Sequence, residues 1–519
     1  MDTLSSKIYK KDFISTFKGD DSGNLQPRQT PGVLYAKAHP SPVKKPVLLA
    51  WSDELAADLQ VAKPENEADL NILAGNLVTS SMYPYAACYA GHQFGQWAGQ
   101  LGDGRAITLG EWQSPDGKIM EMQLKGAGPT AYSRKADGRA VLRSSLREFL
   151  MSEAMFHLRV PTTRALSLVS TGDAVMRDMF YDGHPAFEPG AVVMRVAPSF
   201  LRFGNFEILA ARREAENLKM LTDWTIERFY PHIRGGNKVL DWFKEVVERT
   251  AVLMVQWLRV GFVHGVMNTD NMSVLGLTID YGPYSFLDNY DPSFTPNTTD
   301  LPGRRYAFGQ QASIAYWNLG CLASAIAPLL ADTEELVKEL EAYQDIFWLK
   351  YYEMMGDKLG FDQINPDDIT LIDQFEQVLT AISPDMTIFY SLLADLPAAA
   401  ENEQQVIDHF KPCFYTIPEA AQQKELFDLI TEYRRRITMN SCTPQESTSK
   451  MKRNNPRFIL RNYLLHQAIE ELEKGDDALF IKLREAIKNP YSDKFDEFFK
   501  IRPSWADQKA GSSMLSCSS

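Results

Sequence analysis

The sequence predicts an α+β protein with two lobes, the first built on a sheet and the second mainly on helices. Three observations lead to this prediction. Short apolar runs separated by glycine turns fill residues 86–200, which is typical of antiparallel strands. Apolar residues at helical spacing dominate the chain after that region, as in amphipathic helices. A chain of 519 residues also exceeds what one hydrophobic core usually organises.

The first 85 residues differ in composition from the rest. Residues 1–85 are rich in Pro, Asp and Lys and include the stretch QPRQTPGVLYAKAHPSPVKKP. This composition favours turns and loops over regular elements. We therefore expect an irregular N-terminal extension that wraps the lobes.

The lobe at residues 86–200 is expected to hold one helix packed on a small sheet. QWAGQLGDGRAITLGEW predicts two strands around a Gly-Asp-Gly turn, and KIMEMQLKGAG predicts a third strand that ends at Lys125. RAVLRSSLREFLMSEAMFHL has apolar residues at helical spacing up to Pro161. RALSLVSTG and GAVVMRVA predict two further strands.

Helices are expected from residue 201 to residue 475, and a further helix with a mobile tail over residues 476–519. KVLDWFKEVVERTAVLMVQWLRVGF predicts a long amphipathic helix that leads into VHGVMNTDNMSVLGLTIDYG. SIAYWNLGCLASAIAPLL begins the next helical stretch, and Asp332-Thr333 marks the start of EELVKELEAYQDIFWLKYYEMM.

Charge and cysteine usage exclude several classes of protein. The net charge of −13 argues against a broad nucleic-acid interface. The five cysteines form no CxxC pair, which fits unpaired thiols in a reducing compartment. The N-terminus has no apolar signal-peptide core, and no window reaches the roughly 18 to 20 apolar residues needed to span a bilayer. We expect a cytoplasmic protein without a membrane or nucleic-acid partner.

The stretch VHGVMNTDNMSVLGLTIDYG carries the strongest chemical signal. Small-molecule kinases use HGDxxxxN, in which the Asp accepts a proton from the acceptor hydroxyl and the Asn holds a metal ion. Here Asn271 keeps the spacing, but Val266 stands at the base position. Asp280 then follows an apolar segment in an Asp-Tyr-Gly tripeptide. We expect a hairpin that brings Asn271 and Asp280 together as oxygen ligands for Mg²⁺ or Mn²⁺.

Lys125 and Glu148 complete the set of parts in the order found in kinases. Lys125 ends a predicted strand, and Glu148 lies inside the next predicted helix, which matches the ion pair between a strand lysine and a helix glutamate. The sequence therefore predicts a protein-kinase-like two-lobed fold with an irregular N-terminal extension and a large helical C-terminal region.

Other residues admit two interpretations. Asp270 is either a base for an acceptor hydroxyl or a partner that orients Asn271. Gly102 and Gly104 either let the backbone approach phosphates, with Arg105 adding charge, or form an ordinary hairpin turn. Arg195 and Arg202, seven residues apart, are candidate phosphate ligands and are compatible with two helical turns if the segment is helical. His264 is expected to be structural.

Several long stretches resemble the selenoprotein O family of pseudokinase-like proteins. They are HQFGQWAGQLGDGRA, QLKGAGPTAYSRKADGRAVLRSSLREFL, VMRVAPSFLRFGNFE, HGVMNTDNMSVLGLTIDYGPYSFLD and NNPRFILRNYLLHQAIE. The resemblance implies a kinase-like fold that binds ATP in an inverted orientation and transfers AMP to Ser, Thr or Tyr hydroxyls of proteins. It also implies that UMP transfer from UTP with manganese is possible in bacterial members.

The resemblance also implies roles for individual residues. Asn271 and Asp280 are expected to hold the metal, with Asp270 as the proton acceptor. The residues expected to contact the nucleotide are Gly102, Gly104, Arg105, Lys125, Asp137, Gly138, Arg195, Arg202 and Asp280. Cys517 stands where eukaryotic members carry selenocysteine, but residues 283–310 contain no cysteine to pair with it.

Two alternatives to protein AMP transfer remain open at this point. Val266 favours a silent pseudokinase that binds nucleotide and acts as an interaction module. A small-molecule phosphotransferase with Asp270 as a displaced base is the third hypothesis. With an inverted nucleotide, however, the usual base position has no task, and a valine there has no cost.

Overall fold

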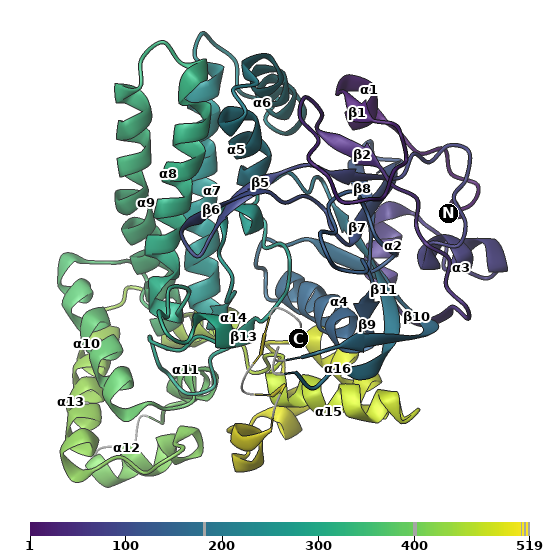
Figure 1. Ribbon diagram of the computed structural model, residues 1–519. Coiled ribbons are helices and arrows are strands. Elements are labelled where there is room, and N and C mark those ends of the chain that lie inside the picture. The colour runs from purple at the N-terminus through teal and green to yellow at the C-terminus, as the bar shows by residue number, and fades with distance from the viewer. Residues whose placement is uncertain (180–182, 398–401, 510, 513–514, 517–519) are drawn as a thin grey trace.

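The computed structural model describes residues 1–179, 183–397, 402–509, 511–512 and 515–516. Its chain forms a sheet-rich lobe and a larger helical lobe that lie side by side (Figure 1). This confirms the α+β class and the two-lobed organisation expected from the sequence.

A nine-stranded, mostly antiparallel sheet forms the smaller lobe. The strands follow the spatial order β1-β2-β4-β7-β8-β11-β10-β3, and β9 pairs with β11. Central strands such as β7 and β8 are buried along nearly their whole length, because helices and the N-terminal segment cover both faces. The bounds are β1 Gly19–Asp20, β2 Tyr35–Lys37, β3 Val47–Trp51, β4 Tyr85–Ala87, β7 Ala106–Gln113, β8 Ile119–Lys125, β9 Ala140–Val141, β10 Arg164–Arg177 and β11 Ala186–Ala197.

The N-terminal segment contains more regular structure than its composition suggested. It supplies β1 and β2 at one edge of the sheet, β3 at the other edge, and the short helices α1 (Asp12–Thr16), α2 (Asp53–Leu59) and α3 (Glu67–Ala74). Two of these helices have side-chain caps, from Ser52 and Asn66. The strands are two to five residues long, and β2 and β3 pair with strands outside this segment, so local sequence signals do not reveal them.

Helix α4, Leu142–His157, packs on β10 and β11 and carries an unusually polar buried surface. Its Arg147 is 2 % exposed and donates hydrogen bonds to Asn462 Oδ1 and to the carbonyl oxygen of Tyr284, each at 3.0 Å. The Tyr284 hydroxyl in turn donates to the Arg147 carbonyl oxygen. Arg147 therefore joins the small lobe to two separate segments of the large lobe.

The larger lobe is built around α7, whose Trp242, Phe243, Val246 and Val247 follow helical spacing and are buried. Gly261 ends this helix in the left-handed region, at φ 75°. A two-stranded ladder of β12 (Phe262–Val263) and β13 (Ser285–Phe286) follows. The helices are α5 Phe203–Ala211, α6 Ala215–Phe229, α7 Lys238–Val260, α8 Gln311–Ile326, α9 Glu334–Leu359, α10 Pro366–Ile382, α11 Met386–Ala394, α12 Glu403–Phe410, α13 Ala420–Ile437, α14 Pro444–Asn454, α15 Asn462–Glu473 and α16 Ala478–Ile487.

One helical stretch passes a test for membrane spans, contrary to the expectation from the sequence. Phe308–Leu329 is long and apolar enough by length and composition, and 44 % of its most apolar window is buried inside the protein. The α8 part of it packs against α5, α7 and α9. Core helices of soluble proteins pass the same test, so this finding is weak evidence for a membrane span.

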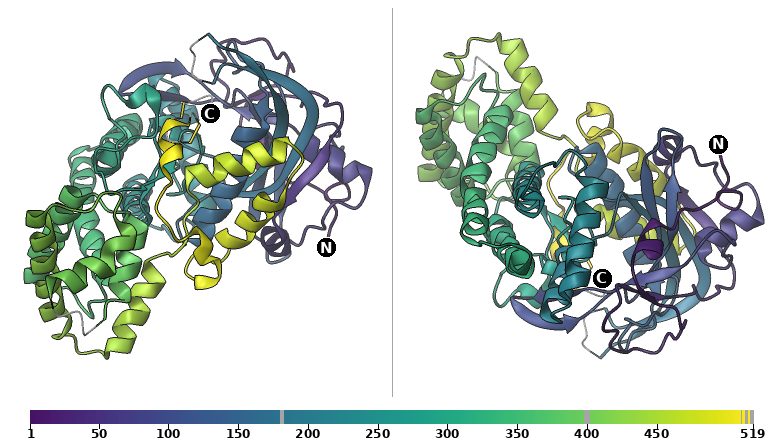
Figure 2. Two further views of the ribbon diagram at one scale, coloured as in Figure 1. Left: turned by 90° about the horizontal axis from the view of Figure 1, so that it is seen from below. Right: turned by 90° about the horizontal axis from the view of Figure 1, so that it is seen from above.

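The C-terminal helices return to the small lobe. Figure 2 shows α15 and α16 beside α4, and both helices contact it. The expected boundary at residue 475 falls between these two helices, which also contact each other; the domain limits stay a prediction. Cys88, Cys321, Cys413 and Cys442 are unpaired as expected, and Cys517 lies outside the described residues.

Candidate functional site

A cleft of about 690 Å³ lies where the two lobes meet. The small lobe contributes the ends of β7, β8 and β11 and the segment 132–141, and the large lobe contributes Val266, Asn271, Asp280 and Gly282. Most of the predicted site residues line this cleft, namely Gly102, Gly104, Arg105, Lys125, Asp137, Gly138, Arg195, Asn271 and Asp280. Glu148, Arg202 and Asp270 are buried directly beside its lining.

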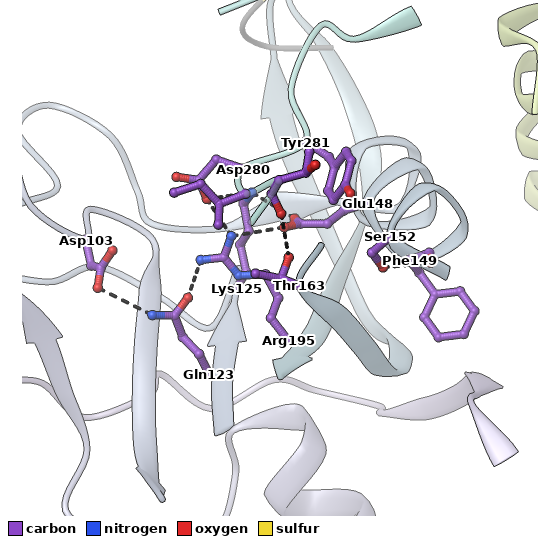
Figure 3. Close-up of polar contacts among 12 residues, drawn as sticks. Asp103, Gln123, Lys125, Glu148, Phe149, Ser152, Thr163, Arg195, Asp280 and Tyr281 are labelled. Atoms are coloured by element: carbon purple, nitrogen blue, oxygen red, sulfur yellow. Dashed lines mark hydrogen bonds and ion pairs between the residues drawn. The ribbon is translucent and has the colours of Figure 1, made fainter. Parts of the chain in front are cut away.

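Lys125 and Glu148 form the ion pair that their order in the chain predicted. Lys125 Nζ lies 2.7 Å from Glu148 Oε2, and both side chains are almost fully buried. Lys125 is the last residue of β8, and α4 places Glu148 against the same sheet face (Figure 3). Burial lowers the pKa of Lys125, and the Glu148 carboxylate opposes this effect.

Arg195 extends this pair into a network. It lies on β11 directly opposite Gln123 of β8, so both side chains point to the cleft face. Its guanidinium donates to Glu148 Oε1 at 3.0 Å, to Asp280 Oδ1 and to Gln123 Oε1 (Figure 3). The sequence pointed to Arg195 but gave no signal for Gln123, because pairing between β8 and β11 sets that contact.

Asp280 is the anionic centre of the network. Arg195 and Arg202 each donate to one of its carboxylate oxygens, and Lys125 Nζ lies 4.0 Å from Oδ1. Burial raises the pKa of Asp280, but the charges of Arg202, Arg195 and Lys125 outweigh it and hold that pKa well below the usual value. The residue has φ 56°, in the left-handed region that non-glycine residues rarely occupy. Local structure thus turns an ionised carboxylate toward the cleft.

Arg195 and Arg202 do not share a helix. Arg202 is the N-cap residue of α5, with extended backbone, whereas Arg195 belongs to a strand. Arg202 is 1 % exposed and also donates to the carbonyl oxygen of Asp270 at 2.6 Å. It therefore holds Asp270 and Asp280 together from beneath the cleft, and direct contact with a nucleotide stays a prediction.

Asn271 and Asp280 supply oxygen donors that fit a divalent metal ion. Asn271, in the 3-10 turn Thr269–Asn271, donates its amide to the Val266 carbonyl oxygen at 2.8 Å. That bond leaves Asn271 Oδ1 as an acceptor in the lining of the cleft that Asp280 shares. An amide oxygen beside an ionised carboxylate is the donor set that Mg²⁺ and Mn²⁺ prefer.

The expected hairpin between Asn271 and Asp280 is absent from this described part of the chain. Residues 272–279 form only isolated bridges, from Ser273 to Arg202 and from Thr278 to Thr162. His264 fixes the segment as a structural residue, since its Nε2 lies 2.9 Å from the Ile279 carbonyl oxygen and its ring stacks on Trp257. Burial lowers the pKa of His264.

Asp270 has the environment of a proton acceptor. It is 8 % exposed, Gln93 Nε2 donates to its Oδ2 at 3.3 Å, and its Oδ1 has no hydrogen-bond partner among the described residues. Burial raises the pKa of Asp270 to about 6, against the opposing effects of Arg202 and Gln93. A carboxylate with a pKa near the working pH suits general-base catalysis.

A short hairpin of β5 (Ala90–Gln93) and β6 (Gln96–Gln100) covers Asp270. A Cβ atom on Gly91 would lie 2.4 Å from Asp270 Oδ1 and 2.9 Å from Asp270 Cβ, closer than such atoms approach in proteins. Only glycine therefore lets β5 pass this close to the carboxylate. The sequence did not single out Gly91 or Gln93.

We predict that Gly91→Ala lowers the turnover rate about 10²-fold by displacing Asp270, since a shift of about 1 Å at a reacting group has an effect of that order. ATP affinity, measured by calorimetry, should stay within a few-fold of wild type because Gly91 does not line the cleft. Gly236→Ala is the matched control, since a Cβ there meets nothing within 4 Å. An unchanged turnover rate in Gly91→Ala would show that this contact does not position Asp270.

The Gly-Asp-Gly sequence is not the ordinary hairpin turn that was one of its two interpretations. The strand before it, β6, pairs with β5, and the strand after it, β7, pairs with β4 and β8. Gly102 and Gly104 line the cleft, and a Cβ on either would come within 3 Å of Tyr132. Asp103 between them is buried and accepts from the backbone N–H of Ala87 at 3.1 Å. Close approach of backbone is therefore the feature that requires both glycines.

Asp137 and Gly138 lie at the mouth of the cleft. Asp137 forms an ion pair with Arg177. Burial raises the pKa of Asp137, but the hydrogen bonds from Arg177 and from the Arg139 backbone lower it more, so this pKa lies below its usual value. Gly138 has φ 69°, and a Cβ on it would lie 2.2 Å from the Gly128 backbone. These contacts shape the loop that closes one side of the cleft.

Three cations in the cleft make no side-chain hydrogen bond or ion pair with any residue that the structure describes. They are Arg105, Arg134 and Lys135, the last two exposed. The sequence predicted only Arg105. The dipeptide Arg134-Lys135 was a detectable signal, but its position opposite Gly104 follows from the fold. A site rich in unpaired cations suits a polyanionic ligand such as a triphosphate.

The fold and this site define a kinase-like nucleotide-binding protein, with a buried lysine–glutamate pair and an amide and a carboxylate side by side at the lobe interface. A family model described as protein adenylyltransferase SelO matches residues 28–488. The chain belongs to this family.

Relatives of similar length support the assignment. The chain is 62 % identical over 519 residues to protein nucleotidyltransferase YdiU of Cytophaga hutchinsonii, with 100 % of both chains covered. It is 50 % identical to protein nucleotidyltransferase YdiU of Aromatoleum aromaticum, covering 99 % of this chain and 100 % of that one. ROP2 from Toxoplasma gondii, a solved structure described as having a protein-kinase fold and no enzymatic activity, covers 56 % of this chain and 86 % of its own at 12 % identity. The TM-score between the two structures is 0.25.

Proposed function

We propose that the protein transfers AMP from ATP to Ser, Thr or Tyr hydroxyls of protein substrates and releases pyrophosphate. One observation carries the proposal: the kinase base position is a valine in the cleft lining, whereas Asp270, four residues on, is a buried carboxylate with a free oxygen and a raised pKa. The proton acceptor has therefore moved away from the place that γ-phosphoryl transfer uses.

An inverted nucleotide fits this arrangement. The α-phosphate then lies near Asp280 and Asn271, and the β- and γ-phosphates extend toward the unpaired cations Arg105, Arg134 and Lys135. Their charge would stabilise the pyrophosphate as it leaves. Val266 needs no acid–base function in this orientation.

The chemical step balances with the residues at hand. The acceptor oxygen forms a bond to the α-phosphorus, the bond between that phosphorus and the bridging oxygen to the β-phosphate breaks, and the hydroxyl proton passes to the Asp270 carboxylate. Pyrophosphate leaves with the electrons of the broken bond. Arg202, bonded to the Asp270 carbonyl oxygen and to Asp280, keeps the base and the metal-binding carboxylate in fixed relation.

A divalent ion held by Asn271 and Asp280 would neutralise phosphate charge and orient the α-phosphate. Both Mg²⁺ and Mn²⁺ suit the oxygen donors, and UTP in place of ATP is part of the proposal for the manganese-loaded enzyme. The compartment proposed for this activity is the cytoplasm.

A nucleotide-binding interaction module is the second candidate. It is favoured by the cover that β5 places over Asp270 and by the two arginines that already occupy the Asp280 carboxylate. The same network is, however, costly to bury without a ligand to bind, since several charges lie close together in a partly desolvated site.

ATP labelled at either the α- or the γ-position separates these functions. With magnesium or manganese and protein acceptors, we expect label from the α-position on the protein and none from the γ-position. The α-label should be lost when the acceptor hydroxyls are blocked. Val266→Asp should not create γ-phosphate transfer, because that position then faces the wrong end of the nucleotide. Transfer of γ-label by either protein would refute the inverted orientation, and binding without any transfer would support the interaction module.

A further inference from the structure

A second cluster of metal-binding side chains lies outside the cleft, on the far side of the hairpin that covers Asp270. His92, Glu207 and Cys321 come from β5, α5 and α8, and their ligand atoms all lie within 4.8 Å of one another. Figure 1 shows the β5–β6 hairpin reaching from the sheet toward these helices, and α5 contacts both β5 and α8. Three separate elements thus converge on one point.

Hydrogen bonding within the protein leaves this cluster incomplete. His92 Nδ1 lies 2.6 Å from Glu207 Oε1. Glu207 is 4 % exposed, and its second oxygen, Oε2, has no hydrogen-bond partner in the part of the chain that the structure describes, although the Thr269 hydroxyl is near enough to oppose the rise of the Glu207 pKa on burial. Cys321 Sγ makes no hydrogen bond to any described residue. A simple histidine–glutamate pair therefore accounts for only one of the carboxylate oxygens.

The surroundings suit a soft, compact cation. Trp97 and Trp317 pack against the His92 ring, with ring centroids 5.0 and 5.4 Å away. Imidazole, carboxylate and thiolate together are typical zinc ligands, and three protein ligands leave a fourth position for water. Glutamate and thiolate carry two negative charges, which one Zn²⁺ ion balances; Glu207 is buried, and His92 and Cys321 are half-buried.

We propose that His92, Glu207 and Cys321 form a Zn²⁺ site that fastens the β5–β6 hairpin over Asp270. The link is short. The backbone N–H of His92 donates to Thr269 Oγ1 at 2.7 Å, and the next residue, Gln93, donates to Asp270. Zinc binding would release the Cys321 proton, since burial and the Glu207 charge raise the pKa of this thiol to about 12 against the opposing charge of Arg305, and the metal would stabilise the thiolate further.

Metal content tests the site directly. The full-length protein, stripped with a chelator and dialysed against Zn²⁺, should bind one equivalent that resists gel filtration. Cys321→Ser and His92→Gln should each lose that equivalent. Cys442→Ser, another half-exposed free cysteine, and His157→Gln, another histidine beside a glutamate, should retain it. Asp280→Asn should also retain it, which separates this site from the nucleotide cleft.

Two further measurements test the zinc site in protein that carries all three ligands, so they do not depend on folding of the ligand variants. Wild-type protein loaded with Co²⁺ should show thiolate-to-cobalt charge-transfer absorption, and Cys442→Ser should show the same band. Zinc should also slow amide hydrogen exchange in residues 90–100. Absence of a bound equivalent, binding that survives both ligand substitutions, or a Co²⁺ complex without the thiolate band would each overturn the assignment.

Discussion

Asp280→Asn is expected to reduce AMP transfer by about 10³-fold or more. The substitution removes the carboxylate that would hold a metal ion together with Asn271. Loss of an electrostatic group of this kind lowers reaction rates by about this factor. It also leaves Lys125, Arg195 and Arg202 without their common anion. We therefore expect the free energy of unfolding to fall by about 3–5 kcal/mol, as when one partner of a buried ion pair is removed.

The two effects are measured separately, by transfer of α-labelled ATP and by urea denaturation at pH 7. Asp345→Asn, at an exposed position of α9, is the control and should change neither quantity. Because the pKa of Asp280 is held well below its usual value, the residue stays ionised throughout the neutral range. Wild-type transfer rates in Asp280→Asn with either metal would refute its role as a ligand.

Asp270→Asn is expected to lower the turnover rate by about 10²–10⁴-fold, the range typical of a lost general base. ATP affinity should change little, because Asp270 does not line the cleft. The wild-type rate should fall as the pH drops below about 6, where the Asp270 carboxylate takes up a proton. The residual rate of the variant should not show this fall at low pH. If the rate of Asp270→Asn still falls near pH 6, the titrating group is another residue.

The same substitution is expected to stabilise the protein at neutral pH. Burial raises the pKa of Asp270 from about 3.8 when unfolded to about 6 when folded. The folded state thus holds more protons between these values, so this residue costs stability progressively as the pH rises from about 4 to about 6. The neutral amide of the variant avoids that cost. The free energy of unfolding of the variant should therefore exceed that of wild type by about 1–3 kcal/mol at pH 7 and should equal it near pH 4. Denaturation at both pH values checks the sign, and lower stability of the variant at pH 7 would contradict the burial argument.

Order along the chain was enough to predict the centre of the site. Lys125 and Glu148 pair because a strand that ends in lysine is followed by a helix that packs on the same sheet, a relation that periodicity reveals. Asn271 and Asp280 came from spacing alone. Their route together differed from the expected hairpin, since residues 272–279 bridge to other segments.

Contacts set by long-range pairing could not be predicted. Gln123 meets Arg195 only because of the register between β8 and β11. The N-terminal strands join both edges of the sheet although their sequence is rich in turn formers. Gly91 has no positive φ and no motif of its own; its importance appears only when Asp270 is placed against it.

The buried cross-link made by Arg147 has a consequence for control of the enzyme. Many kinases are silenced when the helix that carries the catalytic glutamate swings away from the sheet. In this protein such a movement would break the hydrogen bonds from the Arg147 guanidinium to two acceptors on distant segments. The buried charge would then lack partners, which costs several kcal/mol. Helix α4 is therefore expected to stay fixed against the sheet. Inhibition would then act on the segments that control entry of nucleotide and acceptor to the cleft.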